Sequence, residues 1–170
     1  MSYVIANEQI IVPAQIHYLP ELRKFISRIA SKYRFSKNEI NAMTISVDEA
    51  CTNIIKHGYR DKQAGSITMN VRIKKDSLVV ELIDQGKSYD PTQASDPNIP
   101  YYVQSGKKGG LGIFIMKKFL DEIQYITVGQ KNILRLIKFR KDGGIYPLFI
   151  PITSAFRRIK EIFFPARSTK

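Results

Sequence analysis

The spacing of apolar residues near the start of the chain predicts a strand followed by a helix. We predict the strand over residues 3–12, because Pro13 cannot take part in further strand pairing. Apolar side chains then recur every three or four residues over residues 20–34, which is the spacing of a helix with one face on a core. The recurring positions are Leu22, Phe25, Ile26, Ile29 and Tyr33.

A second helix is predicted over residues 36–57. Ser36 and Glu39 form the S-x-x-E capping-box pattern at its start, and Gly58 is a common residue just past a helix end. The helix carries one apolar stripe, so it is expected to pack on the same core as the first helix. The stripe consists of Ile40, Met43, Val47, Ala50 and Ile54.

The rest of the pattern predicts further strands and one more helix. Residues 67–73 alternate between apolar and polar, as in a half-buried strand, and residues 78–83 are nearly all apolar, as in a central strand. The polar stretch over residues 85–108 is longer than an ordinary connection, which is typical of a functional or a disordered loop. A helix over residues 113–120 and strands over residues 123–128 and 133–139 complete the order.

This order of elements indicates an α+β fold. Adjacent hairpins predict a mixed, mainly antiparallel sheet, and helices that cover one face of it make a two-layer α/β sandwich. We place one domain over residues 1–144 and a basic, amphipathic C-terminal extension over residues 145–170.

Composition narrows the class of protein. A chain of 170 residues with 44% hydrophobic and 25% charged residues is typical of one folded domain. Cys51 is the single cysteine, and no run approaches the ~20 apolar residues of a membrane-spanning helix, so we expect a cytoplasmic protein. The net charge of +12 suits nucleic acid, acidic lipid or an acidic protein, although the basic residues are spread along the chain.

Polar residues on the second predicted helix are the first candidates for chemistry. Glu49, Asn53 and His57 are spaced four apart, so they lie along one helix face. A carboxylate can act as a general base, and an amide oxygen can bind a hard cation such as Mg²⁺. The same pattern also fits a solvated helix face.

Asp84 and Gly86 follow the predicted central strand. A carboxylate at a strand end can accept a hydrogen bond from an exocyclic base amine, and glycine lets a flat ring approach the backbone. An ordinary turn fits this pair as well, because Asp and Gly are common in turns.

The segment from Gly106 to Gly112 predicts an anion site. Its glycines open a helix, whose free N–H groups and positive end favour phosphate, and Lys107 or Lys108 could add a charge-assisted contact. Gly86-Lys87-Ser88 does not complete a P-loop, because Glu81 stands where that motif requires glycine.

Taken together, these segments resemble a known superfamily. E-A-C-T-N-I-I-K-H-G-Y over residues 49–59 resembles the Asn box of the Bergerat ATPases and kinases. D-Q-G-K-S-Y-D-P over residues 84–91 and G-G-L-G-I-F-I-M-K-K-F-L-D-E over residues 109–122 resemble its glycine boxes. Their joint order in so short a chain is similar to the anti-sigma-factor serine kinases in particular.

The resemblance implies roles for matching residues. Asn53 would hold Mg²⁺ against the phosphates of ATP, and Glu49 would be the general base for a substrate hydroxyl. Asp84 would bind the adenine amine beside Gly86. The phosphates would be held by the glycine-rich loop, whose matching residues are Lys107, Lys108, Gly109, Gly110 and Gly112.

The resemblance also implies partners. A serine/threonine kinase of this kind phosphorylates an anti-sigma-factor antagonist, sequesters a sigma factor and forms a homodimer, and no direct DNA binding is expected. The alternative is a regulatory module that binds ATP without phosphotransfer. The extension over residues 145–170 departs from the family pattern, and it suits packing on the domain, a partner protein or an acidic membrane.

Overall fold

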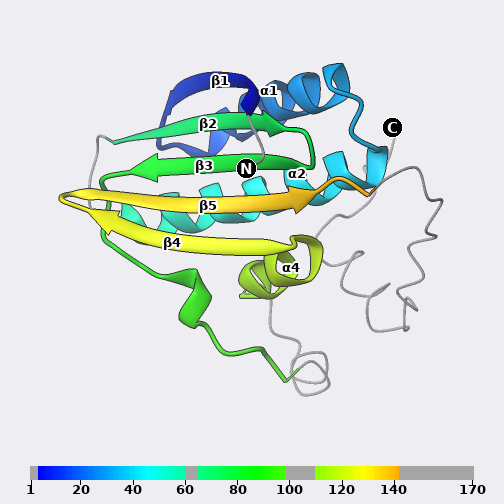
Figure 1. Ribbon diagram of the computed structural model, residues 1–170. Helices are drawn as coiled ribbons and strands as arrows, with labels where there is room; N and C mark the ends of the chain where they lie inside the picture. The colour runs from blue at the N-terminus through cyan, green and yellow to red at the C-terminus, as the bar shows by residue number, and fades with distance from the viewer. Residues whose placement is uncertain (1–3, 60–64, 99–109, 142–170) are drawn as a thin grey trace, which may run out of the picture. The chain divides into compact units, whose positions relative to one another are not determined.

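A five-stranded sheet forms one layer of the protein (Figure 1). The computed structural model describes residues 4–59, 65–98 and 110–141. The spatial order of strands is β1-β2-β3-β5-β4, and all neighbouring pairs are antiparallel. The strands are β1 (Val4–Pro13), β2 (Ser66–Lys74), β3 (Ser77–Asp84), β4 (Glu122–Val128) and β5 (Lys131–Phe139).

Helices form the second layer, on one face of this sheet (Figure 1). They are α1 (Leu19–Lys32), α2 (Lys37–Asn53) and α4 (Gly112–Phe119). Short 3-10 turns lie at Ile16–Tyr18 and Pro91–Gln93. The structure therefore confirms the two-layer α+β fold, with each described helix and strand within a few residues of its predicted position.

The core lies between the two layers. Strand β2 buries every second residue, and β3 is buried over almost its whole length, as predicted for half-buried and central strands. Complete burial of a Leu, Ile or Met side chain contributes ~1.5–3 kcal/mol. The largest fully buried side chains are Leu22, Ile26, Ile29, Met43, Ile67, Met69, Ile73, Leu78, Leu82, Leu111, Met116 and Leu136.

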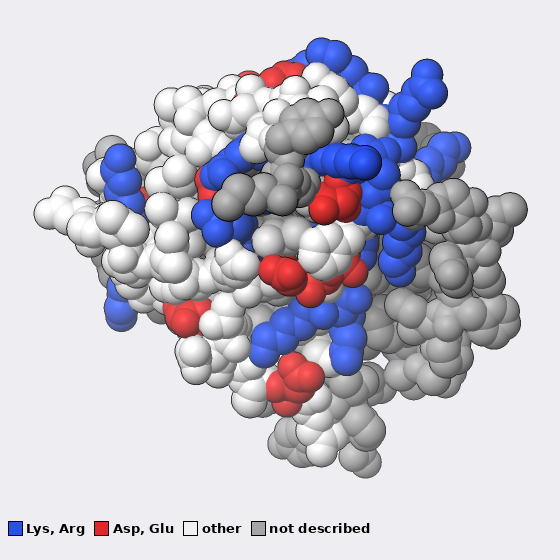
Figure 2. Space-filling view, in the orientation of Figure 1, with Lys and Arg blue, Asp and Glu red and all other residues white. Residues whose placement is uncertain are grey.

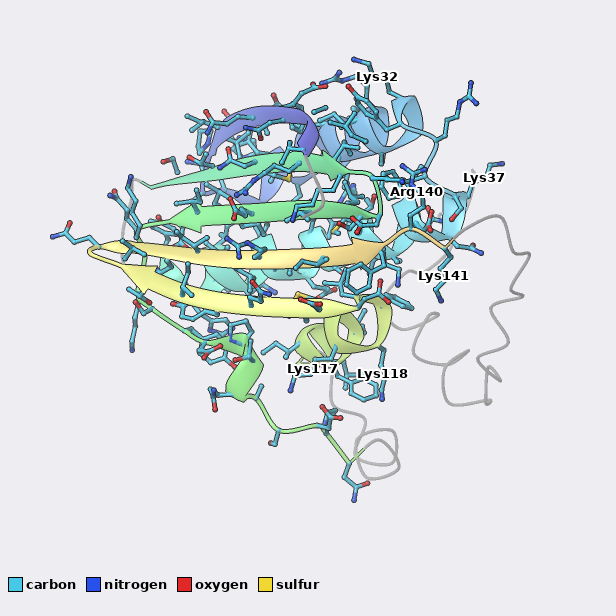
Figure 3. All side chains as sticks on the ribbon, viewed as in Figure 1. Lys32, Lys37, Lys117, Lys118, Arg140 and Lys141 are labelled. Carbon is cyan, nitrogen blue, oxygen red and sulfur yellow. The ribbon has the colours of Figure 1, made fainter. Side chains whose placement is uncertain are left out.

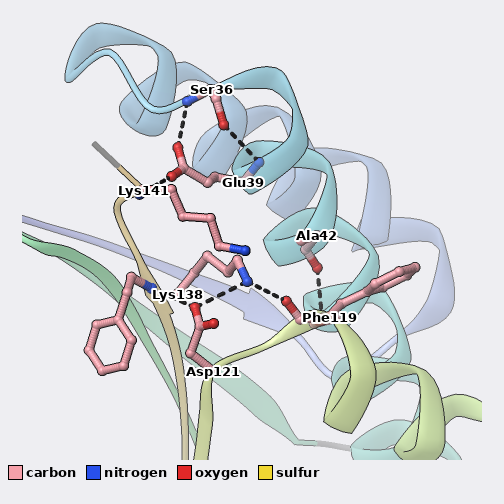
Figure 4. A network of polar contacts seen from close by, with 9 residues as sticks. Ser36, Glu39, Ala42, Phe119, Asp121, Lys138 and Lys141 are labelled. Carbon is pink, nitrogen blue, oxygen red and sulfur yellow. Dashed lines mark hydrogen bonds and ion pairs between the residues drawn. The ribbon is translucent and has the colours of Figure 1, made fainter. Parts of the chain in front are cut away.

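The capping box at the start of α2 is present as predicted (Figure 4). The Glu39 backbone N–H donates to Ser36 Oγ at 3.2 Å, and the Ser36 backbone N–H donates to Glu39 Oε2 at 2.7 Å. The second carboxylate oxygen of Glu39 accepts the backbone N–H of Lys141 at 2.7 Å. One buried carboxylate therefore caps α2 and fixes the chain that leaves β5.

The prediction of one α-helix through His57 is wrong in its last turn. Residues Ile54–Gly58 form a π-helical turn, which follows the end of α2 at Asn53. A π-turn holds one more residue than an α-turn, and such turns are frequent at functional sites. Gly58 ends this turn, as the sequence predicted, and its carbonyl accepts the Lys87 backbone N–H at 2.9 Å.

An ion-pair cluster occupies the sheet face opposite the helices. Glu81 on β3 is 5% exposed, and it pairs with Arg135 of β5 at 2.7 Å and with Arg72 of β2. Burial raises the pKa of the Glu81 carboxyl, but the hydrogen bonds and charges of Arg135 and Arg72 outweigh it and lower that pKa below its ordinary value. The nearly apolar central strand therefore tolerates a carboxylate, because two cations cover it.

The described elements belong to one compact unit, formed by residues 4–95 and 111–141 of the described chain. Residues 96–98 and 110 belong to a second unit, which also includes positions outside the described residues. Two predicted segments fall outside the described residues. They are the extension over residues 145–170 and residues 99–108 of the long loop over residues 85–108. No helix in the described residues has the length and apolar character needed to cross a bilayer.

Candidate functional site

The candidate site is a small open pocket where α2, β3 and β5 meet. The end of α2 and its π-turn form one wall, the end of β3 supplies a carboxylate, and β5 begins opposite it. Apolar and polar side chains share the lining, as is usual for small-molecule pockets. The lining residues are Ala50, Asn53, Ile54, His57, Gly58, Asp84, Lys87, Tyr89, Pro91, Met116, Tyr125, Asn132 and Leu134.

Asp84 is the buried carboxylate of this pocket, with 6% of its surface exposed. Its Oδ1 accepts the Gly86 backbone N–H at 2.7 Å and the Asn132 side-chain amide at 3.2 Å. Burial raises the pKa of the Asp84 carboxyl, and these two hydrogen bonds offset part of the rise. Within the described residues, both hydrogen bonds fall on Oδ1, so Oδ2 is the oxygen that a ligand can use.

Asn132 holds Asp84 in place, and the sequence pattern did not reveal it. Its amide donates to Asp84 Oδ1 and to the Gly86 carbonyl at 3.1 Å, while its Oδ1 accepts from Tyr125 at 3.0 Å and Ser88 at 2.7 Å. The residue is 3% exposed, so its polar atoms depend on these partners. Strand register alone places it here, because Asp84 pairs with Asn132 between β3 and β5.

Gly86 packs against the π-turn. A Cβ on Gly86 would lie 2.8 Å from the Gly58 carbonyl oxygen and 2.9 Å from the Gly58 Cα, distances that side chains do not tolerate. The predicted contact with a flat ring therefore stays a prediction, since Gly86 is not among the lining residues of the pocket. The structure gives another reason for glycine at position 86, because the backbones of Gly86 and Gly58 approach each other closely.

Asn53, His57 and Lys87 place polar groups along the pocket wall. Asn53 is the last residue of α2, where the sequence placed it on the same face as Glu49. Lys87 was not a predicted site residue, yet it brings an exposed cation to the pocket. The His57 ring lies 6.2 Å from the Tyr89 ring, centroid to centroid, at the open side.

Glu49 lies one turn before Asn53 and contacts the start of α4. A Cβ on Gly112 would collide with the end of the Glu49 side chain, so the carboxylate would have to move aside if this glycine were replaced. Burial raises the pKa of the Glu49 carboxyl, the Asp48 charge raises it further, and Lys56 lowers it. A raised pKa suits a general base that works near neutral pH. Glu49 is not among the pocket-lining residues in this structure.

The glycine-rich loop is described only at its end. Gly110 has φ +88°, a conformation that favours glycine, and a Cβ there would meet open space. Lys107, Lys108 and Gly109 lie outside the described residues. Among the residues that are described, no group of three or more His, Cys, Asp or Glu side chains could hold a metal ion.

A protein-family model accounts for most of this chain. The model of the histidine kinase-like ATPase domain matches residues 12–138, a range that contains all the described strands and helices except most of β1 and the last residue of β5. The chain belongs to this family. The match includes Glu49, Asn53 and Asp84, and it agrees with the resemblance inferred from the boxes.

Comparison with related proteins indicates to which branch of the family this chain is similar. The chain is 34% identical over 141 residues to a serine-protein kinase RsbW of Bacillus licheniformis, covering 78% of this chain and 87% of that protein. It is 31% identical over 128 residues to a serine-protein kinase RsbW of Bacillus velezensis, covering 73% of this chain and 80% of that protein. The chain is thus a histidine kinase-like ATPase of the anti-sigma kinase type.

A solved structure shares the fold. A crystal structure of the RsbU and RsbW domains of a Mycobacterium tuberculosis protein matches with a TM-score of 0.57 and 13% identity. The match covers 80% of this chain and 33% of that one. At this identity the likeness shows the fold alone.

Proposed function

We propose that this chain is an ATP-dependent serine/threonine protein kinase and anti-sigma factor. The observation that carries the proposal is the buried Asp84 carboxylate, which is fixed through Oδ1 and lines the open pocket beside Asn53. The identities of 31–34% to serine-protein kinases support the reaction class. ATP would be the phosphoryl donor, and Mg²⁺ would neutralise charge on its phosphates.

The residues present suit an adenine nucleotide. Asp84 Oδ2 can accept a hydrogen bond from the adenine amine, and Met116 and Leu134 offer apolar contact to the ring. Asn53 would contribute an oxygen to Mg²⁺, which in nucleotide sites commonly takes few protein ligands besides phosphates and water. Lys87, Lys107 and Lys108, with Gly109, Gly110 and Gly112, would complete the contacts to the phosphates.

Glu49 would be the catalytic base. It would accept the proton of the substrate serine or threonine hydroxyl as the phosphoryl group is transferred. Its raised pKa supports this role, because a carboxylate becomes a stronger proton acceptor as its pKa rises. Its contact with the start of α4 implies that the α4 end of the loop must shift before a substrate hydroxyl can reach this carboxylate.

The proposed partners follow from the branch of the family. The substrate would be an anti-sigma-factor antagonist, and the protein would sequester a sigma factor when that antagonist is phosphorylated. By the same resemblance, the protein would be a cytoplasmic homodimer. A second candidate is a regulatory module that binds ATP without transferring phosphate. The position of Glu49 against Gly112, outside the pocket lining, favours that candidate.

Calorimetry followed by a transfer assay separates these functions. The full chain is titrated with Mg-ATP and Mg-ADP, and then used with Mg-ATP to retain proteins from an extract of the native cell, which are examined for phosphoserine and phosphothreonine. Binding with phosphorylation of a retained protein supports the kinase. Binding without phosphorylation supports the module, and no heat of binding to folded protein refutes both.

A further inference from the structure

A row of apolar side chains crosses the sheet on the face opposite the helices. Strand register places its five members opposite one another on successive strands. We call it the isoleucine row, because four of its residues are isoleucines. In spatial order from β1 to β4, its members are Ile11, Thr68, Ile83, Ile133 and Ile126.

The isoleucine row is open to solvent, most of all at its ends. Ile11 is 62% exposed and Ile126 is 46% exposed, whereas the three middle residues are half-buried. Val128, the next residue of β4 on this face, is 60% exposed. Figure 2 looks onto this face and shows mostly uncharged surface toward the β4–β5 turn. Apolar side chains that gather in this way are typical of an interaction surface.

The pattern on this face is nearly the same when it is read from either edge of the sheet. The isoleucine row begins and ends with isoleucine, and a polar row beside it begins and ends with glutamine. A two-fold interface needs a surface that is complementary to itself. A second copy turned by 180° about an axis along the central strand β3 would place Ile11 of one copy on Ile126 of the other. The polar row consists of Gln9, Asn70, Glu81, Arg135 and Gln124.

The charges of this face do not oppose such a contact strongly. The isoleucine row itself is uncharged, and Glu81 in the polar row is paired with Arg72 and Arg135. Lys131, on the other side of the row, is exposed and can extend into solvent. The six cations labelled in Figure 3 lie toward the end of the domain where β5 finishes, away from the β4–β5 turn. That end of β5 is ~20 Å along the strand from Ile133, more than twice the Debye length of ~8 Å at physiological salt, so its charge is largely screened at the row.

The face is large enough for a stable dimer. Neighbouring strands lie ~4.8 Å apart, so the five strands span ~19 Å, and the nine residues of β2 or β5 extend ~30 Å. Two such faces in contact would bury about 1,200 Å² in total, which is the lower end of the range for stable protein interfaces. A single helix is only about 10 Å wide, so it would cover the isoleucine row and leave the polar row open. A second sheet covers both rows.

We propose that two copies of this chain associate through the isoleucine row, with their sheets packed face to face and Ile11 of each copy against Ile126 of the other. Sheets that pack in this way keep their strands within about 30° of each other. This surface belongs to the homodimer included in the proposed function, and it rests on that proposal in this respect only. ATP binding and phosphotransfer play no part in the contact.

Association through the row leaves the nucleotide pocket of each copy free. Asp84 and Asn132 are buried on the helix side of the sheet and line the pocket. Their chain neighbours Ile83 and Ile133 point to the opposite face, because side chains alternate along a strand. The pocket and the row are therefore back to back across one layer of strands, and each copy can bind a nucleotide while it is paired.

Sedimentation equilibrium of the full-length protein without nucleotide tests the proposal. Ile11→Lys and Ile126→Asp each place a charge at one end of the row, and a variant with both substitutions places Lys against Asp where the ends of two copies meet. Ile16→Asp is the matched control, because Ile16 is 47% exposed, like Ile126, but lies in the turn before α1. Circular dichroism and thermal unfolding verify that all variants are folded alike.

We expect a dimer with a dissociation constant below about 10 μM, which either single substitution weakens at least about tenfold and the control leaves unchanged. The double variant should associate more tightly than either single variant, because each buried charge then has a partner. A dimer that tolerates the single substitutions, responds equally to the control or is not restored in the double variant would overturn the proposed surface alone. A monomeric wild type would overturn both the surface and the homodimer, and would leave the proposed kinase reaction untouched.

Discussion

Asn132 donates to both the Asp84 carboxylate, at 3.2 Å, and the Gly86 carbonyl, at 3.1 Å. One amide on β5 thus joins the end of β3 to the loop that follows it. Because Asn132 Oδ1 also accepts from Tyr125 and Ser88, a chain of partly buried hydrogen bonds holds the Asp84 carboxylate. Its orientation is set before any ligand binds.

Replacing Asp84 by Asn is expected to abolish ATP binding without loss of stability. The side-chain oxygen of Asn can accept the same hydrogen bonds from Gly86 and Asn132. Its NH₂ group, however, takes the place of Oδ2, and this donor would face the adenine amine, which is also a donor. Calorimetry should show weak or absent ATP binding and a relative gain for inosine triphosphate, whose ring has an oxygen at that position. Retained ATP affinity in this variant would refute the role of Asp84.

The same variant has a defined pH dependence. Burial raises the folded-state pKa of Asp84, so ionisation costs stability as the pH rises from the unfolded-state pKa through the folded-state pKa. The amide that replaces this carboxyl does not ionise and has no such cost. The variant should therefore be at least as stable as the wild type at pH 7 in thermal unfolding, and the difference should shrink as the pH falls below about 4.

Replacing Asn132 by Ala is expected to weaken ATP binding about tenfold or more and to destabilise the fold by about 1–3 kcal/mol. The substitution leaves the buried Asp84 without one donor and the half-buried Tyr125 without its acceptor. Calorimetry and denaturant unfolding measure the two effects. Asn70→Ala is the matched control, because Asn70 bonds to Gln9 on the far face of the sheet; an equal loss of affinity there would contradict the assignment.

Replacing Glu49 by Gln is expected to abolish phosphotransfer while ATP binding stays within about twofold. Transfer by the wild type should rise with pH as Glu49 loses its proton, with a midpoint above the ordinary glutamate pKa of about 4.3. Single-turnover rates across pH measure this rise. Asp48→Asn should move the midpoint down, because the Asp48 charge raises the Glu49 pKa. Undiminished transfer in the Gln variant would exclude Glu49 as the base.

Replacing Glu81 by Gln is expected to lower the free energy of unfolding by about 1–3 kcal/mol at pH 7, because Arg72 and Arg135 lose a charged partner. The folded-state pKa of Glu81 lies below its unfolded value, so its contribution is present above the unfolded pKa and is lost as the pH falls through the folded pKa. Glu8→Gln, which removes the more exposed pair with Arg28, should cost less than about 1 kcal/mol. Equal costs would contradict the cluster's role.

The sequence predicted the elements well because each has a strong local signal. The capping box of Ser36 and Glu39, the alternation along β2 and the apolar run of β3 all depend on neighbours in the chain. The π-turn at Ile54–Gly58 has no such signal, and the contacts that accompany it, the bond from Lys87 and the packing of Gly86, are long-range.

The sequence predicted those residues of the candidate site that belong to a recognisable motif, and no others. Asp84 and Asn53 both line one pocket, and their roles toward ATP stay predictions, whereas Asn132 belongs to none of the motifs and was not a predicted site residue. Its partner Asp84 lies 48 residues away, so strand register had to be known first. Lys87 was not a predicted site residue, because the P-loop pattern around it is incomplete. In the structure it nevertheless lines the pocket.

The π-turn makes the site depend on the number of residues as well as on their kinds. Deleting a single residue between Asn53 and Gly58 would let regular α-helix continue and would turn the Gly58 carbonyl away from Lys87. Every side chain of the site could then be intact while the loop after β3 lost its anchor. Among related chains, length in this short stretch should therefore be as tightly constrained as the identity of Asp84 itself.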